Sequence, residues 1–145
     1  MIVPDVNLLL HAYTPTSSSH KKALLWLQSV LSGEEPVGLP WQVISAFLRI
    51  VTNRKLPGFG RPIEEATAII EDWLKQPNVH LLTAGDAHWM LFRRMMLEGQ
   101  ASGDLVSDAH LAALTVEHGG VLYTTDRDFA RFPGLRWENP IAERS

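Results

Sequence analysis

The sequence predicts an α/β fold, a three-layer α/β/α sandwich around a mainly parallel central sheet, in one domain over residues 1–145. Short apolar runs alternate along the chain with longer segments whose apolar residues recur at helical spacing. This alternation implies strand–helix–strand crossovers, which make a sheet parallel and cover both of its faces. The length of 145 residues and the absence of repeats or Gly- and Pro-rich linkers favour one core.

The first half of the chain contains two predicted strands and three predicted helices. The apolar run 1–3 is a strand, and a short helix follows at 6–12. Apolar residues at helical spacing predict a helix over 19–31, which ends at the pair Ser32-Gly33. Segment 37–39 is a brief strand. Pro40 then suits the first turn of a helix that runs to about Thr52 with one apolar face.

The second half continues the same alternation. Arg61-Pro62 opens a helix that ends before Pro77, and a strand follows at 79–82. Two further helices end near glycines, at Gly99 and at Gly119-Gly120. These helices and the remaining strands occupy residues 87–97, 106–117, 121–123 and 135–137.

Composition excludes several classes of protein. With no cysteine, the chain has no disulfides, no thiolate metal site and no cysteine nucleophile. No stretch approaches the roughly 18 apolar residues of a membrane span, so we expect no membrane association and a cytoplasmic protein. The net charge of -3 means that a polyanion must be met by local basic groups, for which Arg49 and Arg127 are candidates.

Three aspartates stand where this fold gathers functional groups. Asp5 follows the first strand, and Asp126 follows the strand at 121–123 after two threonines. The carboxyl ends of parallel strands meet at one edge of the sheet, where a crevice opens at a topological switch. Asp108 lies in the first turn of the helix at 106–117, where free N–H groups favour a carboxylate.

Carboxylates gathered in this way repel one another unless a cation neutralises them. Oxygen ligands with open positions suit Mg²⁺ or Mn²⁺, which keep several waters and accept phosphate oxygens. Such a metal activates a water for phosphodiester hydrolysis. Each aspartate also has a structural explanation as a helix cap or turn residue, and it is the combination that favours a catalytic metal site at Asp5, Asp108 and Asp126.

At these residues the sequence resembles the PIN-domain family and, within it, the VapC-type toxins of bacterial toxin–antitoxin pairs. The resemblance rests on the segments PDVNLL at 4–9, DAHLAAL at 108–114 and TDRDF at 125–129, and it spans nearly the whole chain. It implies an endoribonuclease with a Mg²⁺ or Mn²⁺ cofactor and an RNA substrate. It also implies frequent homodimers and a small antitoxin protein whose C-terminal segment covers the acidic site.

One position departs from the family pattern. The family's second acid is a Glu on the helix after the second strand, and the matching position here is Ala46. The segments FLRIVTN at 47–53 and FARFPGLRW at 129–137 resemble a VapC-type branch that carries a small residue at this position. Asp104 and Asp128 are candidates for an extra acid, and Asn7 is a candidate to orient Asp5.

Two other readings remain open from the sequence. Because of Ala46, the chain is alternatively a PIN-like module that binds protein or RNA with weak or lost nuclease activity. A phosphatase or receiver domain fits less well, because Asn7 occupies the second acidic place of Asp-x-Asp phosphatases. His110 receives no role, because it lies two residues from Asp108 and is expected on another side of the helix.

Overall fold

The computed structural model describes residues 1–142, and a parallel five-stranded sheet lies at its centre. The strand order is β3-β2-β1-β4-β5, and every neighbouring pair is parallel. The predicted α/β class is therefore confirmed. The strands are β1 (Ile2–Pro4), β2 (Val37–Pro40), β3 (Val79–Leu82), β4 (Val121–Tyr123) and β5 (Trp137–Glu138).

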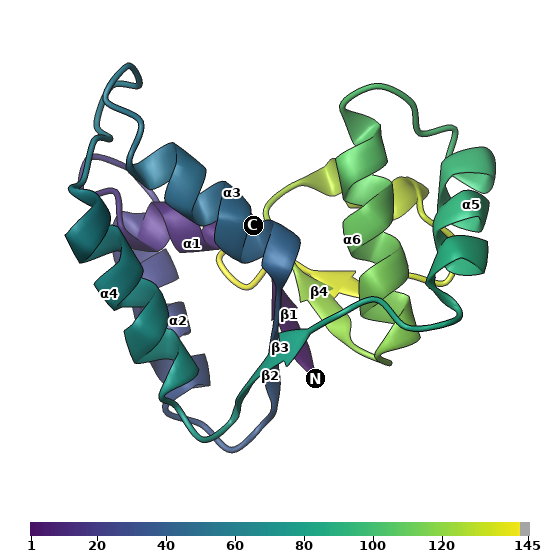
Figure 1. The fold of residues 1–145 in the computed structure, drawn as a ribbon, viewed down its shortest axis with the longest axis horizontal. Helices are drawn as coiled ribbons and strands as arrows, with labels where there is room; N and C mark the ends of the chain where they lie inside the picture. The colour runs from purple at the N-terminus through teal and green to yellow at the C-terminus, as the bar shows by residue number, and fades with distance from the viewer. Residues whose placement is uncertain (143–145) are drawn as a thin grey trace.

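Six α-helices cover the two faces of this sheet in the described part of the chain. Figure 1 shows α1 to α4 on one side of the strands and α5 and α6 on the other, which gives the three layers. The helices are α1 (Val6–Ala12), α2 (His20–Leu31), α3 (Trp41–Val51), α4 (Ile63–Leu74), α5 (His88–Glu98) and α6 (Leu105–Glu117), with a 3₁₀ helix η1 (Arg127–Arg131) after β4.

The sequence predictions miss these bounds by only a residue or two, including the last strand near the C-terminus. The final strand was expected at 135–137 and forms at Trp137–Glu138, because Arg136 and Glu138 provide the backbone oxygens that accept from Leu122 and Thr124 of the β4 segment. The end of α6 is as expected, since Gly119 adopts a φ of 65°, the left-handed conformation that commonly follows a helix.

The core follows from the apolar faces of these elements. Phe47 on α3 has no exposed surface and packs against Tyr13 and Trp73, whose ring centroids lie 5.6 and 4.8 Å away. The indole nitrogen of Trp73 donates a 3.0 Å hydrogen bond to the Tyr13 hydroxyl, so the polar atoms of this cluster are paired. On the other face, α6 buries the small residues Ala109, Ala112 and Ala113 completely. Small side chains let α6 approach the sheet and α5 closely.

The centre of the sheet is its topological switch point. The chain moves outward from β1 through β2 to β3, and then returns to place β4 on the other side of β1. Pro4 pairs with Tyr123 at the ends of these two strands, and the backbone nitrogen of Asp5 donates to the Tyr123 carbonyl at 2.9 Å. The residues that follow β1 and β4 therefore lie side by side, at the edge where ligands bind in open α/β sheets. No helix among residues 1–142 is long and apolar enough to cross a membrane.

Candidate active site

Asp5 is the most deeply buried acid of the site, with 6% of its surface exposed. Its Oδ1 accepts a 2.8 Å hydrogen bond from the backbone nitrogen of Val6, which makes Asp5 the cap of α1. Its Oδ2 accepts a 2.8 Å bond from the Thr124 hydroxyl. Burial raises the pKa of Asp5, the two hydrogen bonds oppose this shift, and the charge of Asp126 adds to it. The carboxyl group is thus held by the first residue of α1 and by the residue that follows β4.

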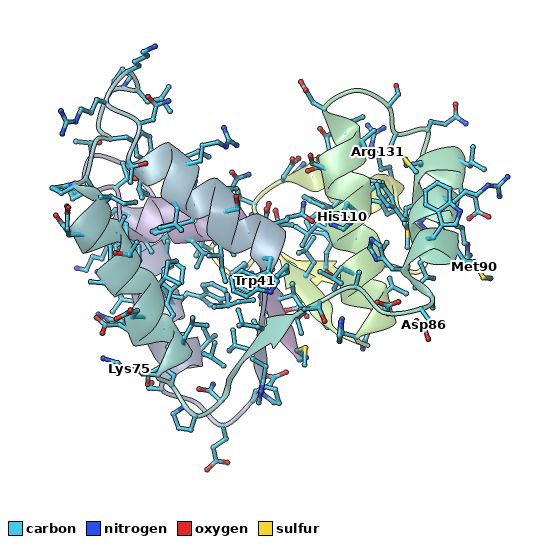
Figure 2. The ribbon with its side chains drawn as sticks, viewed as in Figure 1. Trp41, Lys75, Asp86, Met90, His110 and Arg131 are labelled. Carbon is cyan, nitrogen blue, oxygen red and sulfur yellow. The ribbon has the colours of Figure 1, made fainter. Side chains whose placement is uncertain are left out.

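Asp108 enters the site from the first turn of α6, as the sequence predicts. Its pKa is raised to about 6, first by burial and then by the negative charges of Asp5, Asp126 and Asp128, while Arg131 lowers it. Figure 2 shows Arg131 beside the N-terminal half of α6. The Asp108 carboxylate is thus poorly solvated, and it lies near three other negative charges that Arg131 only partly offsets.

Asp5 and Asp108 line one cavity of about 410 Å³, together with residues of α1, α3 and α6. The first turns of α3 contribute Gln42 and Ser45 to its wall. Nε2 of Gln42 donates a 2.9 Å hydrogen bond to the backbone carbonyl of Ser107, so it ties α3 to the start of α6. This cavity brings together acids that are far apart in the chain.

Ala46 and Arg49 lie on the same wall of α3. A methyl group therefore faces the cavity where the family resemblance expects a carboxylate. Arg49 is exposed and reaches the same space, so its guanidinium group is placed to meet an anion that enters.

Asp126 lies beside the cavity without being part of its wall. Its Oδ1 accepts a 2.8 Å hydrogen bond from the backbone nitrogen of Asp128, which caps η1, and its own nitrogen donates to the Thr124 hydroxyl at 3.0 Å. Its charge nevertheless raises the pKa of both Asp5 and Asp108. Among residues 1–142, no three Asp, Glu, His or Cys side chains are grouped closely enough to hold a metal ion between them.

The remaining predicted candidates lie at different places. Asn7 lines a separate hollow with His11 and Phe59, on another side of α1. Asp128 is exposed and acts on Asp108 through its charge. Asp104 and Arg127 are exposed and contribute nothing to the cavity wall.

Three contributors to the site were missed by the sequence reasoning. Thr124 bridges Asp5 and Asp126 through its hydroxyl group, and its position directly after β4 was the available signal. Gln42 lies one helical turn before Ala46, so the spacing on α3 points to it. The sequence assigns no role to His110, which lies two residues from Asp108, yet both residues line the cavity.

The PIN domain family model matches residues 2–135, and the chain therefore belongs to the PIN-domain family. Its curated relatives are VapC ribonucleases. Ribonuclease VapC37 of Mycobacterium tuberculosis is 41% identical over 144 residues, covering 98% of this chain and 99% of that protein. Ribonuclease VapC33 of the same species is 36% identical over 143 residues, covering 99% of this chain and 100% of that protein.

Solved structures share the fold. VapBC2 from Rickettsia felis, bound to a DNA fragment from its promoter, aligns over 96% of this chain and 98% of its own, with a TM-score of 0.68 and 16% identity. VapC20 of Mycobacterium tuberculosis, described as a sarcin–ricin loop cleaving toxin, aligns over 94% of this chain and 99% of its own, with a TM-score of 0.62 and 21% identity.

Proposed function

We propose that this chain is a metal-dependent endoribonuclease, the toxin of a toxin–antitoxin pair, which hydrolyses RNA phosphodiester bonds. The observation that carries the proposal is the cavity lined by Asp5 and Asp108, whose pKa values are both raised. The names of its relatives, VapC37 and VapC33, support ribonuclease activity.

The side chains around the cavity fit a hard divalent cation. Asp5, Asp108 and Asp126 offer only oxygen donors. The pKa of Asp108 is raised first by burial and then by neighbouring negative charges, and a cation would offset both effects. Mg²⁺ keeps several waters, so it needs few protein ligands and no closed cage. When bound, Mg²⁺ or Mn²⁺ supplies an activated water and stabilises charge on the phosphate. We propose Asp5, Asp108 and Asp126 as its ligands. Among residues 1–142 the three carboxylates are not grouped around one point, so Asp126, which lies outside the cavity wall, would have to turn toward a bound ion.

The other residues of the site position these acids and the substrate. Thr124 holds Asp5 by a hydrogen bond and restricts its rotation, and Gln42 holds the backbone beside Asp108. Arg49 at the cavity, and Arg127 farther out, offer guanidinium groups to RNA phosphates. Because Thr124 and Gln42 are already bonded to the site, little reordering is needed when RNA binds.

The proposed partner is a small antitoxin protein that covers the acidic cavity, and the proposed assembly is a homodimer in the cytoplasm. The solved structures that share the fold include VapBC complexes from Rickettsia felis and from nontypeable Haemophilus influenzae, which supports an antitoxin partner. Co-expression with the protein encoded next to this gene, followed by affinity purification, tests the partner. Light scattering of the purified chain tests the dimer.

Activity is tested with purified protein, Mn²⁺ and total bacterial RNA. Wild type is expected to cut RNA at defined positions, and Asp5→Asn and Asp108→Asn are each expected to abolish cutting. Asp104→Asn serves as the matched control, because Asp104 is exposed and lies outside the cavity wall. Cutting that survives both cavity substitutions rejects the proposal.

Ala46 favours a second candidate function, a PIN-like module that binds protein or RNA without cutting it. The methyl group of Ala46 faces the cavity, so fewer carboxylates are available to hold a metal. Calorimetric titration with Mn²⁺ separates the two candidates. Absence of divalent-ion binding at millimolar concentration, with RNA binding retained, would establish the binding module.

A further inference from the structure

His110 has no part in the arrangement described so far, yet it lines the same cavity as Asp5 and Asp108. Figure 2 shows it on the side of α6 nearer to α3. Its ring is held by two aromatic neighbours from α5. The ring of Phe92 lies 5.2 Å away between centroids, and the ring of His88 lies 4.6 Å away and nearly perpendicular, at 79°.

A hydrogen bond of 2.7 Å joins Nε2 of His88 to Nδ1 of His110. Between two neutral imidazoles, one of these nitrogens carries the hydrogen and the other accepts it. The other nitrogen of His88, Nδ1, is buried and has no partner among residues 1–142. The lack of a partner for this nitrogen indicates which histidine donates in the hydrogen bond between His88 and His110.

If His110 donated through Nδ1, the hydrogen of His88 would have to sit on its buried Nδ1, as an unpaired N–H group. Buried unpaired N–H groups are rare in proteins, and buried acceptors without a partner are tolerated more often. His88 therefore carries its hydrogen on Nε2 and donates it to Nδ1 of His110. Since neutral His110 holds a single ring hydrogen, that hydrogen is on Nε2.

Nε2 of His110 is also the accessible nitrogen of the ring. Within residues 1–142 it makes no hydrogen bond, and it is absent from the set of buried atoms without a partner. It therefore meets solvent. His110 contributes to the cavity wall and His88 does not, so the ring nitrogen of His110 that His88 leaves unoccupied is the one available to a ligand in the cavity.

We propose that His110 donates a hydrogen bond from Nε2 to a phosphate oxygen of the RNA bound at the cavity, and that His88 is the positioning residue that sets this direction. The inference rests on the proposed ribonuclease function for the identity of the anion. An N–H donor is valuable here because Asp5 and Asp108 repel phosphate. His110 gives up no proton in this role, so it acts by binding and orienting the scissile group.

The first test reads the ring hydrogens directly. Long-range ¹H–¹⁵N correlation NMR of the ¹⁵N-labelled wild type at about pH 8, where an ordinary histidine is neutral, assigns the hydrogen to one nitrogen of each ring. The expected result is a hydrogen on Nε2 of both His88 and His110. A hydrogen on Nδ1 of His110 overturns the proposal, whatever reaction the protein catalyses.

The second test removes the donor. Single-turnover cleavage of fluorescently labelled bacterial ribosomal RNA with Mn²⁺ is compared for His110→Leu, which has no donor, and His110→Gln, whose amide nitrogen takes the place of Nε2. Loss of one hydrogen bond to a charged group corresponds to about a 10- to 100-fold lower ratio of maximal rate to half-saturating concentration. His110→Gln is expected to recover part of that loss. His80→Leu is the matched control, since His80 is exposed on β3.

Two further measurements exclude a merely structural role. Mn²⁺ affinity by calorimetry is expected to be equal in wild type and His110→Leu, because the assigned ligands are untouched. His88→Leu is expected to lower the RNA cleavage ratio as well, and His88→Gln, which keeps an N–H donor, less so. Equal cleavage by His110→Leu and wild type overturns the inference and leaves the ribonuclease standing, whereas a wild type that cuts no RNA rejects the proposed function itself.

Discussion

Replacing Thr124 by valine removes one hydroxyl group at the centre of the site and preserves its shape. In wild type this hydroxyl, which has no exposed surface, donates a 2.8 Å hydrogen bond to the buried carboxylate of Asp5. A hydrogen bond to a charged group contributes about 1.5–3 kcal/mol to stability. The free energy of unfolding of Thr124→Val is therefore expected to fall by about that amount, which lowers the melting temperature by roughly 4–10 °C for a chain of this size.

Thr115→Val is the matched control for this change. Thr115 is equally buried, and its hydroxyl donates a 2.8 Å bond to the backbone carbonyl of Leu111, a neutral acceptor. Loss of such a bond costs about 0.5–1.5 kcal/mol. Urea unfolding of both variants in EDTA at neutral pH measures the difference.

The cost of Thr124→Val is expected to shrink as the pH falls. Because burial raises the pKa of Asp5, its carboxyl group becomes protonated at a higher pH than an ordinary aspartate, and the charge on the acceptor is then lost. Equal destabilisation by Thr124→Val and Thr115→Val at neutral pH would show that Thr124 does not hold a charged Asp5.

Three further changes test the electrostatics of the cavity. Because the pKa of Asp108 is raised to about 6, the folded protein binds this proton more tightly than the unfolded chain, so the contribution of Asp108 to metal-free stability is present at low pH and is lost as the pH rises through about 6. Solvent screening reduces this loss of stability to roughly 1–2 kcal/mol. Asp108→Asn has no charge at position 108 and should not lose this stability, so at neutral pH in EDTA the variant is expected to unfold at a higher urea concentration than wild type. Ala46→Glu should raise Mn²⁺ affinity in calorimetry and lower metal-free stability, and unchanged affinity would place position 46 outside the metal site. Gln42→Met removes the hydrogen bond to Ser107, which is destabilising, and a buried Oε1 without a partner, which is stabilising, so the free energy of unfolding should change by less than about 1 kcal/mol. The variant should nevertheless cleave RNA more slowly, because the start of α6 is held less firmly.

The sequence alone predicts the elements and the acids that follow them, because both depend on local signals. Apolar spacing, prolines and glycines fix the helices and strands to within a residue or two. Asp5 and Asp126 are recognisable because each follows a strand, and Asp108 because it opens a helix.

The contacts between these elements are not local, and the sequence does not reveal them. The bond from Thr124 to Asp5 joins residues 119 positions apart, and it depends on β4 lying beside β1 rather than at an edge. The direction of side chains on a helix separates His110 from Asp108, but a cavity can be wide enough for both residues to line it. For Asn7, which lies two residues from Asp5, the rule on helix direction does hold, because Asn7 lines a hollow on another side of α1.

The central place of β1 has a consequence for how the protein is made. β1 is synthesised first, and β4, which covers its second edge, contains Val121, the partner of Ile2 in the register. Until that segment leaves the ribosome, β1 has an open edge, and Asp5 lacks both Thr124 and Asp126. A chain that ends before residue 121 therefore lacks Thr124 and Asp126, and the unpaired edge of β1 favours aggregation. The proposed set of Asp5, Asp108 and Asp126 is therefore complete only after β4 has been synthesised and has paired with β1.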